Sequence, residues 1–493
     1  NDRVLGVKSG LDLEMPNSGG ITDKLVAAAV GAGELDEGAL DRVVIRNVAL
    51  SLSAKDRQTP SIAADPVSQH KLARETAAQC CVLLKNDEQI LPLSATQPLA
   101  LIGAFAEKPR FQGAGSSQVR PTQVDTLVAA LAEYTEAVTY AAGYDPIHSE
   151  PDQGLIDEAV RAASAAEVAV VFAGLPGIYE SEGFDREHMC LPPQHDALIR
   201  AVAAANPRTV VVLANGAPVE MPWVDEVGAI LEGYLGGQAA GGAIADVLMG
   251  VRNPSGKLAE TFAEQLSDIP SQPWFPGEHR QMQYREGLYV GYRYFDTARR
   301  SVLFPFGHGL SYSHFDLPQV ILSNDTLTAQ RSVKLTVEVK NTGSMAGAEV
   351  VQVYRHCKNS LVHRPDQELC GFAKLHLEAG AGGSVEIQLL PDSFQIFDHG
   401  TQNWILESGP VELRIGVSSR DIRLTKMLNI ASVDVPSTLA AGVPWPEFLP
   451  ADAGQGLAVS DFAFAQMLNR SVPEPEALRP FHRNSSVREI GTT

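Results

Sequence analysis

Apolar and polar residues follow three different patterns along the chain. In residues 22–54, apolar side chains recur every three or four positions, which predicts two helices divided at Gly31-Ala-Gly33. From residue 78 to 262, short apolar runs alternate with helical stretches. Beyond Phe315, apolar and polar residues alternate one by one in short segments. The chain is therefore expected to combine α/β and all-β parts.

The middle region predicts a mostly parallel sheet with helices on both faces. Its expected strands are Cys81–Leu84, Ala100–Gly103, Val138–Tyr140, Val168–Phe172, Val210–Leu213 and Ile230–Gly233. The helices expected between them are Thr126–Tyr134, Ile156–Ala166, Leu198–Ala204 and Ala239–Leu248. An earlier stretch, Gly6–Pro16, is expected to hold the end of a short helix, a strand and a proline stop.

The alternating region predicts an antiparallel β-sandwich of the immunoglobulin or fibronectin type. Its expected strands are Val333–Val339, Glu349–Tyr354, Gln367–Leu377, Val385–Leu390 and Pro410–Val417. The preceding residues 263–300 have little periodicity and are interpreted as a long ordered connector. The last sixty residues contain an amphipathic segment, Phe462–Leu468, and are expected to pack over another domain.

Composition and charge narrow the choice of partners. Of the 493 residues, 44% are hydrophobic and 20% are charged, and the formal net charge is −20. This charge argues against nucleic acid and anionic membranes as partners. No run of eighteen apolar residues occurs, so no membrane span is predicted, and a cytoplasmic or periplasmic location is favoured over a membrane. The five cysteines do not form a disulfide-rich pattern, although Cys357 and Cys370 are candidates for pairing.

Several common site motifs are missing or incomplete. Gly113–Ser117 does not fit a dinucleotide loop, and Gly250–Lys257 does not fit a nucleotide phosphate loop. Neither the serine-hydrolase elbow nor a His-Glu-x-x-His or Cys-x-x-Cys pair occurs. Neither a cofactor nor a metal site is therefore predicted.

Carboxylates remain as candidates for chemistry. Glu180, Glu182, Asp185 and Arg186 follow the predicted strand Val168–Phe172, and loops at the carboxyl ends of strands commonly bind ligands in α/β sheets. Asp185 and Arg186 are expected to form a rigid ion pair. The alternative interpretation is a solvated acidic loop.

A secondary candidate is Glu286, within the aromatic-rich stretch Tyr284–Phe295. Aromatic rings around carboxylates suit the binding of sugars, whose rings stack on aromatic faces while carboxylates transfer protons. A structural clasp of arginine and tyrosine side chains is the other interpretation of this stretch.

Together, these segments resemble glycoside hydrolase family 3, in particular its multidomain β-glucosidases. The matching segments occur in the order found in the family: Gly10–Pro16, Ala73–Glu75 with Val82–Asn86, Gly113–Ser117, Glu180–Arg186, Gly236–Gln238, Ala245–Leu248 with Asn253–Leu258, Glu286–Tyr294 and Phe304–Tyr312.

The resemblance implies a domain order. Residues 1–58 would be the end of a (β/α)8 barrel, 59–77 a linker, and 78–262 a six-stranded α/β sandwich domain. Residues 263–312 would form the connector, 313–432 a fibronectin type III-like domain, and 433–493 a C-terminal extension. Most of the barrel would lie upstream of this chain.

The resemblance also implies a mechanism, which is retaining hydrolysis of terminal β-glucosidic bonds. The family's nucleophile is an aspartate in a Ser-Asp-Trp motif, which would lie a few residues upstream of Asn1, so this chain alone would be inactive. The family's acid/base motif, Glu-Gly-x-Asp-Arg, falls on Glu182, with Glu180 as runner-up and Asp185 and Arg186 fixing the loop or contacting substrate. To act as an acid near neutral pH, Glu182 needs a raised pKa.

The implied partner is a β-glucoside or an oligosaccharide. A β-xylosidase of the same family is an alternative enzyme, and a noncatalytic carbohydrate-binding or interaction fragment is an alternative of another class. The sequence leaves the oligomeric state open, including a homodimer.

Overall fold

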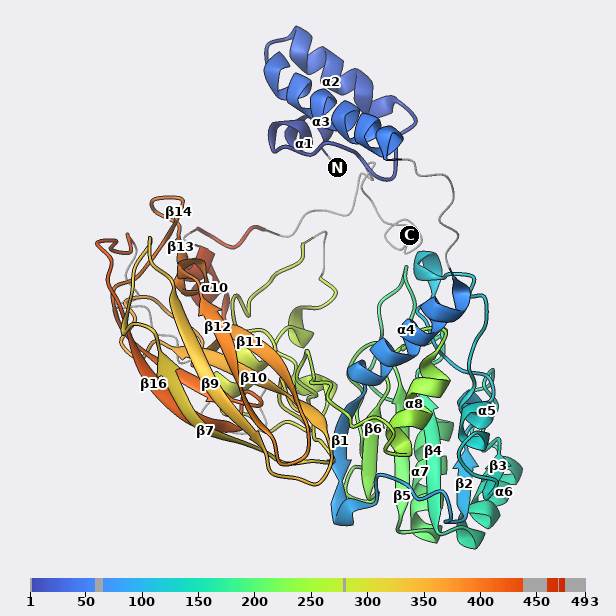
Figure 1. The fold of residues 1–493 in the computed structure, drawn as a ribbon. Coiled ribbons are helices and arrows are strands. Elements are labelled where there is room, and N and C mark those ends of the chain that lie inside the picture. Colours follow the sequence, from blue (N-terminus) through green and yellow to red (C-terminus); the bar gives the residue numbers. More distant parts are fainter. Residues whose placement is uncertain (1, 58–64, 278–280, 438–458, 469, 475–493) are drawn as a thin grey trace. The chain divides into compact units, whose positions relative to one another are not determined.

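The computed structural model describes residues 2–57, 65–277, 281–437, 459–468 and 470–474. Two compact units divide the chain, residues 1–66 and 67–493 (Figure 1). The predicted linker 59–77 and extension 433–493 lie partly outside the described residues. In the described part of the chain, no helix has the length and apolar composition that a membrane span requires.

The described part of the first unit contains three helices: α1 (Arg3–Lys8), α2 (Ile21–Gly31) and α3 (Glu37–Asp56). They bury a small core that includes Val7, Val26 and Val43. The division between α2 and α3 confirms the predicted break at Gly31–Gly33. The strand predicted within Gly6–Pro16 is wrong, because the residues after α1 form no strand pairing in the described structure.

A six-stranded sheet forms the centre of the second unit. Its strands lie in the order β1-β6-β5-β4-β2-β3, and all neighbours run parallel except β1 and β6. The strands are β1 (Val82–Asn86), β2 (Leu99–Ile102), β3 (Val138–Ala141), β4 (Val168–Gly174), β5 (Thr209–Ala214) and β6 (Ala229–Glu232). Most of these strands are buried on both faces, because helices cover the sheet, and this explains their near-continuous apolar runs.

The helices beside the sheet are α4 (Pro66–Cys80), α5 (Leu127–Ala132), α6 (Gln153–Ala165), α7 (Pro193–Ala205) and α8 (Ala240–Leu248). Helix α5 packs against α8, and α6 packs against α7 (Figure 1). Polar side chains start two of them: Thr126 accepts a hydrogen bond from the Ala129 N–H, and Asp152 accepts from the Gly154 and Leu155 N–H groups. The predicted parallel α/β sheet is thus confirmed.

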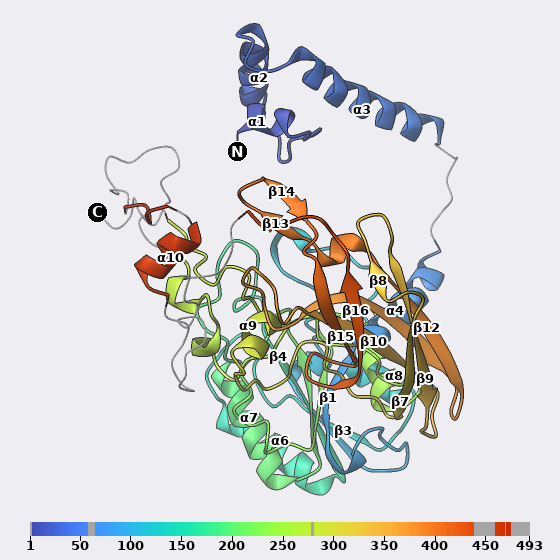
Figure 2. The same cartoon turned by 90° about the vertical axis from the view of Figure 1, so that its left-hand side faces the viewer.

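The connector contains the short helix α9 (Tyr292–Thr297) and a small core of its own. In this core, Tyr294 and Phe295 pack with Phe464 from the C-terminal helix α10 (Asp461–Leu468). Figure 2 labels the two helices, α9 and α10, that carry these residues. The amphipathic segment predicted near residue 462 therefore packs on the connector.

A β-sandwich follows, as predicted. One sheet has the order β11-β10-β15-β16-β8 and the other the order β12-β9-β7, with a separate hairpin of β13 and β14. The strands are β7 (Phe315–Leu322), β8 (Thr326–Leu327), β9 (Val333–Asn341), β10 (Gly347–His356), β11 (Glu368–Leu377), β12 (Gly382–Leu389), β13 (Ile396–Asp398), β14 (Asn403–Ile405), β15 (Gly409–Gly416) and β16 (Ile422–Ile430). Cys357 and Cys370 are free thiols, so they do not pair.

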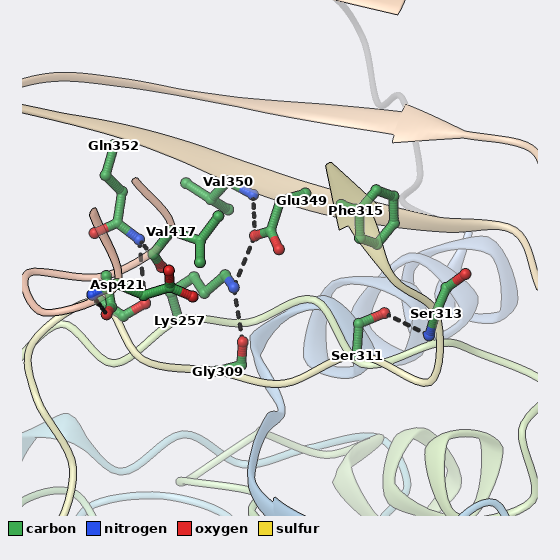
Figure 3. Close-up of polar contacts among 12 residues, drawn as sticks. Lys257, Gly309, Ser311, Ser313, Phe315, Glu349, Val350, Gln352, Val417 and Asp421 are labelled. Atoms are coloured by element: carbon green, nitrogen blue, oxygen red, sulfur yellow. Dashed lines mark hydrogen bonds and ion pairs between the residues drawn. The ribbon is translucent and has the colours of Figure 1, made fainter. Parts of the chain in front are cut away.

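A buried ion pair joins the α/β domain to the sandwich (Figure 3). Lys257 Nζ lies 2.7 Å from Glu349 Oε1 and donates to the Gly309 carbonyl oxygen, also at 2.7 Å. The Val350 N–H donates to the same Glu349 oxygen. The two charged side chains are only 11% and 8% exposed, so their pairing compensates for the burial of both charges. Arg423 also acts electrostatically on Glu349, and Asp421 on Lys257.

Replacing Lys257 with Met is expected to lower the free energy of unfolding by about 3–5 kcal/mol, because Glu349 would remain buried without its partner. A second change, Glu349→Leu, should recover most of this loss. The measurement is denaturant unfolding followed by fluorescence.

Lys334→Met is the matched control, because Lys334 pairs with Glu386 at 44% and 59% exposure. It should cost no more than about 1 kcal/mol. Equal losses for the two lysine variants would contradict the assignment of Lys257 to a buried interdomain pair.

Candidate active site

The candidate residues lie at the carboxyl edge of the six-stranded sheet, where β2 and β4 are neighbours. The chain leaves β2 toward β3 at one edge of the sheet, whereas it leaves β4 toward β5 in the opposite direction. Ligands commonly bind at such a switch point of a doubly wound sheet. The loops after β2 and β4 therefore meet at the position where chemistry is expected.

Glu180 anchors the loop that follows β4. Both of its carboxylate oxygens accept from the Gly216 N–H, at 2.9 and 3.1 Å. Arg110 Nη2 donates to the Glu180 carbonyl oxygen at 3.0 Å and lies 3.8 Å from the carboxylate. Burial lowers the pKa of Arg110, although the charge of Glu180 opposes this shift. Glu180 is thus occupied in holding the loop to the segments after β2 and β5.

Glu182, two residues further along, is exposed and points to a different partner. Its Oε2 accepts from the Ser116 backbone N–H at 2.6 Å and from the Ser116 hydroxyl. Gly115 makes this approach possible, because its φ is +78° and a Cβ there would lie 2.6 Å from the Glu182 Cβ. The turn Gly113–Ser117 follows β2, so both partners lie at the β2–β4 edge.

The Ser116 contacts favour the ionised form of Glu182. The hydroxyl and then the backbone N–H lower the pKa of Glu182, and burial opposes them only weakly because the side chain is exposed. These contacts act against the raised pKa that a bound sugar and the charge of a nucleophile are expected to give Glu182 in the intact enzyme.

The ion pair predicted between Asp185 and Arg186 is wrong. Arg186 Nη1 instead donates to the Pro218 carbonyl oxygen at 3.1 Å. Burial lowers the pKa of Arg186, and the nearby carboxylate of Glu180 is the largest opposing influence. Arg186 thus ties the loop to the segment after β5, while Asp185 is exposed.

A cavity of about 480 Å³ lies beside the loop. Its wall includes Phe105, Tyr179, Phe184, Asp185 and Arg186, but it does not include Glu180, Glu182 or Glu286. Asp185 and Arg186 are therefore brought together with aromatic side chains, whereas Glu182 lies against the Ser116 turn.

Two further carboxylates near Glu180, the buried Glu232 and the half-buried Glu260, were missed from the sequence. Glu232, at the end of β6, accepts from Asn215 Nδ2 at 3.0 Å and from the Tyr234 N–H at 2.8 Å. Burial raises the pKa of Glu232 to about 8. Burial, with the charge of Glu180, raises the pKa of Glu260 to about 7. An acid within the apolar run Ile230–Gly233 was the available signal for Glu232.

Glu286 lies in a different environment. It is 4% exposed, and its Oε2 is buried and has no hydrogen-bond partner among the residues that the structure describes. Its neighbour Arg285 stacks over the Trp274 ring at 3.9 Å and donates to the Val459 carbonyl oxygen and to Asp461. These contacts favour the structural-clasp interpretation for this stretch, although arginine pairs here with tryptophan rather than tyrosine.

At the carboxyl ends of β2 and β4, the exposed carboxylate of Glu182 accepts hydrogen bonds from the Ser116 hydroxyl and backbone amide. The described residues contain no group of three or more His, Cys, Asp or Glu side chains arranged to hold a metal ion. Proton transfer is the chemistry that this arrangement supports most directly.

Comparisons with known proteins give two family matches. The model of the glycosyl hydrolase family 3 C-terminal domain matches residues 81–312, and that of the fibronectin type III-like domain matches residues 349–419. The chain is 47% identical over 435 residues to thermostable beta-glucosidase B of Acetivibrio thermocellus, covering 88% of this chain and 58% of the relative. It is 39% identical to an exo-alpha-(1→6)-L-arabinopyranosidase of Bifidobacterium longum, covering 86% of this chain and 56% of the relative. The chain thus spans little more than half the length of these relatives.

Solved structures give the same picture. The crystal structure of a Bifidobacterium adolescentis GH3 beta-glucosidase superimposes with a TM-score of 0.81 at 38% identity, covering 89% of this chain and 65% of that chain. DesR, a beta-glucosidase from Streptomyces venezuelae solved with D-glucose, gives a TM-score of 0.77 at 28% identity, covering 87% of this chain and 70% of that chain. These matches confirm the α/β sandwich followed by a fibronectin-like domain.

The anchoring role of Glu180 can be tested with Glu180→Ala. This change removes the acceptor of the Gly216 N–H and the carboxylate 3.8 Å from Arg110, whereas the backbone carbonyl that Arg110 also contacts remains. The free energy of unfolding should therefore fall by about 0.5–1.5 kcal/mol. Hydrogen exchange in residues 176–188 should also accelerate. Glu187→Ala, on the same loop but exposed, should change stability by less than about 0.5 kcal/mol. Similar exchange rates in the two variants would show that Glu180 does not anchor the loop.

Proposed function

Since the chain belongs to glycosyl hydrolase family 3, we propose that the intact protein is a retaining β-glucosidase and that this chain supplies its general acid/base, Glu182. The assignment rests on a difference in hydrogen bonding and exposure between the two glutamates of the loop. Glu180 has both oxygens on the Gly216 N–H, whereas Glu182 is exposed at the β2–β4 edge. A proton donor has to reach a substrate, and of the two side chains Glu182 is the exposed one.

The proposed reaction uses two carboxyl groups about 5–5.5 Å apart. In the first step, an aspartate attacks the anomeric carbon while Glu182 gives its proton to the glycosidic oxygen. The bond between that carbon and the glycosidic oxygen breaks, the leaving group departs as an alcohol or a sugar, and a covalent glycosyl–aspartate remains. In the second step, Glu182 takes a proton from water, which attacks the same carbon and releases the sugar. The aspartate would belong to the Ser-Asp-Trp motif that the family resemblance places upstream of Asn1. The substrate would be a β-glucoside or an oligosaccharide.

Glu182 must be protonated when substrate binds, whereas the Ser116 contacts favour its ionised form. Enclosure by a bound sugar and the negative charge of the aspartate both favour the protonated form. The balance of these effects would set the pH range of the enzyme.

A second candidate substrate follows from the relatives. The Bifidobacterium relatives at 39% and 38% identity are named as exo-alpha-(1→6)-L-arabinopyranosidases, which supports a pentopyranoside as an alternative to glucose. A β-xyloside is the other pentopyranoside to be tested. The kcat/KM values for nitrophenyl β-glucopyranoside, α-L-arabinopyranoside and β-xylopyranoside would decide among the three.

Glu182→Gln in the intact protein should lower kcat for cellobiose by about 10²–10⁴-fold, because an unactivated leaving group depends on protonation. A nitrophenyl glucoside, whose leaving group is a weaker base, should lose less in the first step. Glu187→Gln on the same loop is the control and should retain activity. Unchanged turnover of cellobiose by Glu182→Gln would overturn the assignment. The 493-residue chain by itself is expected to show no hydrolysis.

A further inference from the structure

The turn Gly113–Ser117 is a motif without a role in the reaction as described so far. It begins about ten residues after β2 and fits neither phosphate-loop pattern. In the structure, it contacts the proposed acid/base across 66 positions of sequence, through Ser116.

The turn is built to present Ser116. Gln112 and Val119, which flank the turn, are joined by two hydrogen bonds. Gln112 Oε1 accepts from the Val119 N–H at 3.0 Å, and Gln112 Nε2 donates to the Val119 carbonyl oxygen at 3.3 Å. Ser117 Oγ donates to the Ala114 carbonyl oxygen at 3.2 Å, within the turn. The two serines thus have different functions, since Ser117 stabilises the turn and Ser116 contacts Glu182.

The contact between Ser116 and Glu182 requires a residue without a side chain at position 115. A Cβ at this position would lie 2.6 Å from the Glu182 Cβ and 2.7 Å from Oε2, which is closer than real Cβ atoms approach. The residue also has φ +78°, which L side chains rarely adopt. Any side chain at 115 would therefore displace Glu182 from Ser116.

We propose that Ser116 is the positioning residue of Glu182, holding its carboxylate at the β2–β4 edge through its hydroxyl and its backbone N–H. This inference rests on the proposed role of Glu182. Both groups are donors, so their contacts strengthen as the proton leaves Glu182 for the glycosidic oxygen and the carboxylate forms. They weaken when Glu182 takes a proton from water in the second step. Ser116 therefore favours the form of Glu182 that exists between the two steps.

The sign of the expected effect follows from these donors. Removal of the Ser116 hydroxyl makes the carboxylate less favourable and raises the pKa of Glu182. An enzyme that needs protonated Glu182 loses activity as pH rises through this pKa, so the alkaline limb of kcat/KM should move to higher pH. A shift of up to about one pH unit is expected.

The first experiment titrates Glu182 directly in the 493-residue chain, with carboxyl-labelled glutamate observed by NMR and Glu182→Gln used for assignment. Ser116→Ala should raise the pKa of Glu182, and Ser116→Thr, which retains a hydroxyl, should restore much of the original value. Ser117→Ala is the matched control, because it removes a hydroxyl of the same turn that donates only to Ala114. Gly115→Ala should act in the same direction as Ser116→Ala by displacing Glu182.

The second experiment measures kcat/KM against pH in the intact protein with the same variants. The alkaline limb should move upward for Ser116→Ala and Gly115→Ala but not for Ser117→Ala. An unmoved titration in Ser116→Ala, or an equal shift in Ser117→Ala, would overturn the inference. Retained turnover in Glu182→Gln would instead overturn the proposed function and leave the titration result standing, so the two failures are distinguishable.

Discussion

The parallel pairing of β2 with β4 is the constraint on which the candidate site depends. Leu99–Ile102 pairs residue for residue with Val168–Val171, so the two strands lie side by side, and β4 continues to Gly174. The turn that carries Ser116 and the loop that carries Glu182 therefore meet, although they are far apart in the sequence. Gly174 helps to start this loop, because a Cβ there would lie 2.1 Å from the Ala214 carbonyl oxygen at the end of β5. The buried sheet thus fixes the position of the exposed residues Ser116 and Glu182.

Within the loop, two glutamates have opposite physical functions. Glu180 is held by the Gly216 N–H and Arg110, and Arg186 is held by the Pro218 carbonyl oxygen, so the loop is tied to the segment after β5 at both contacts. Between them, the carboxylate of Glu182 is left exposed, and within the described part of the chain it accepts hydrogen bonds from Ser116 alone. Because contacts on both sides of Glu182 fix the loop, a change in the protonation of Glu182 need not move it. This arrangement agrees with the general need for a fixed proton donor in catalysis.

Much of the fold could be predicted from the sequence, because short, mostly apolar runs separated by helical periodicity leave few alternatives to a parallel sheet. The position of Glu182 after a buried strand was also predictable. The order of the strands was not, and the contact with Ser116 depends on that order. Similarly, adjacency in the sequence suggested an ion pair between Asp185 and Arg186, whereas the folded chain offers the arginine a backbone carbonyl instead. The raised pKa of Glu260 follows from burial and from Glu180, neither of which can be read from its own sequence neighbours.

The most direct test of Glu182 as the acid/base is product analysis with an added nucleophile. In Glu182→Ala of the intact protein, a nitrophenyl glucoside should still form the covalent intermediate, but water would no longer be activated to release it. Azide needs no general base, so it should restore turnover and yield a glucosyl azide with the configuration of the substrate retained. If hydrolysis in Glu182→Ala proceeds at the normal rate and azide yields no such product, Glu182 is not the acid/base.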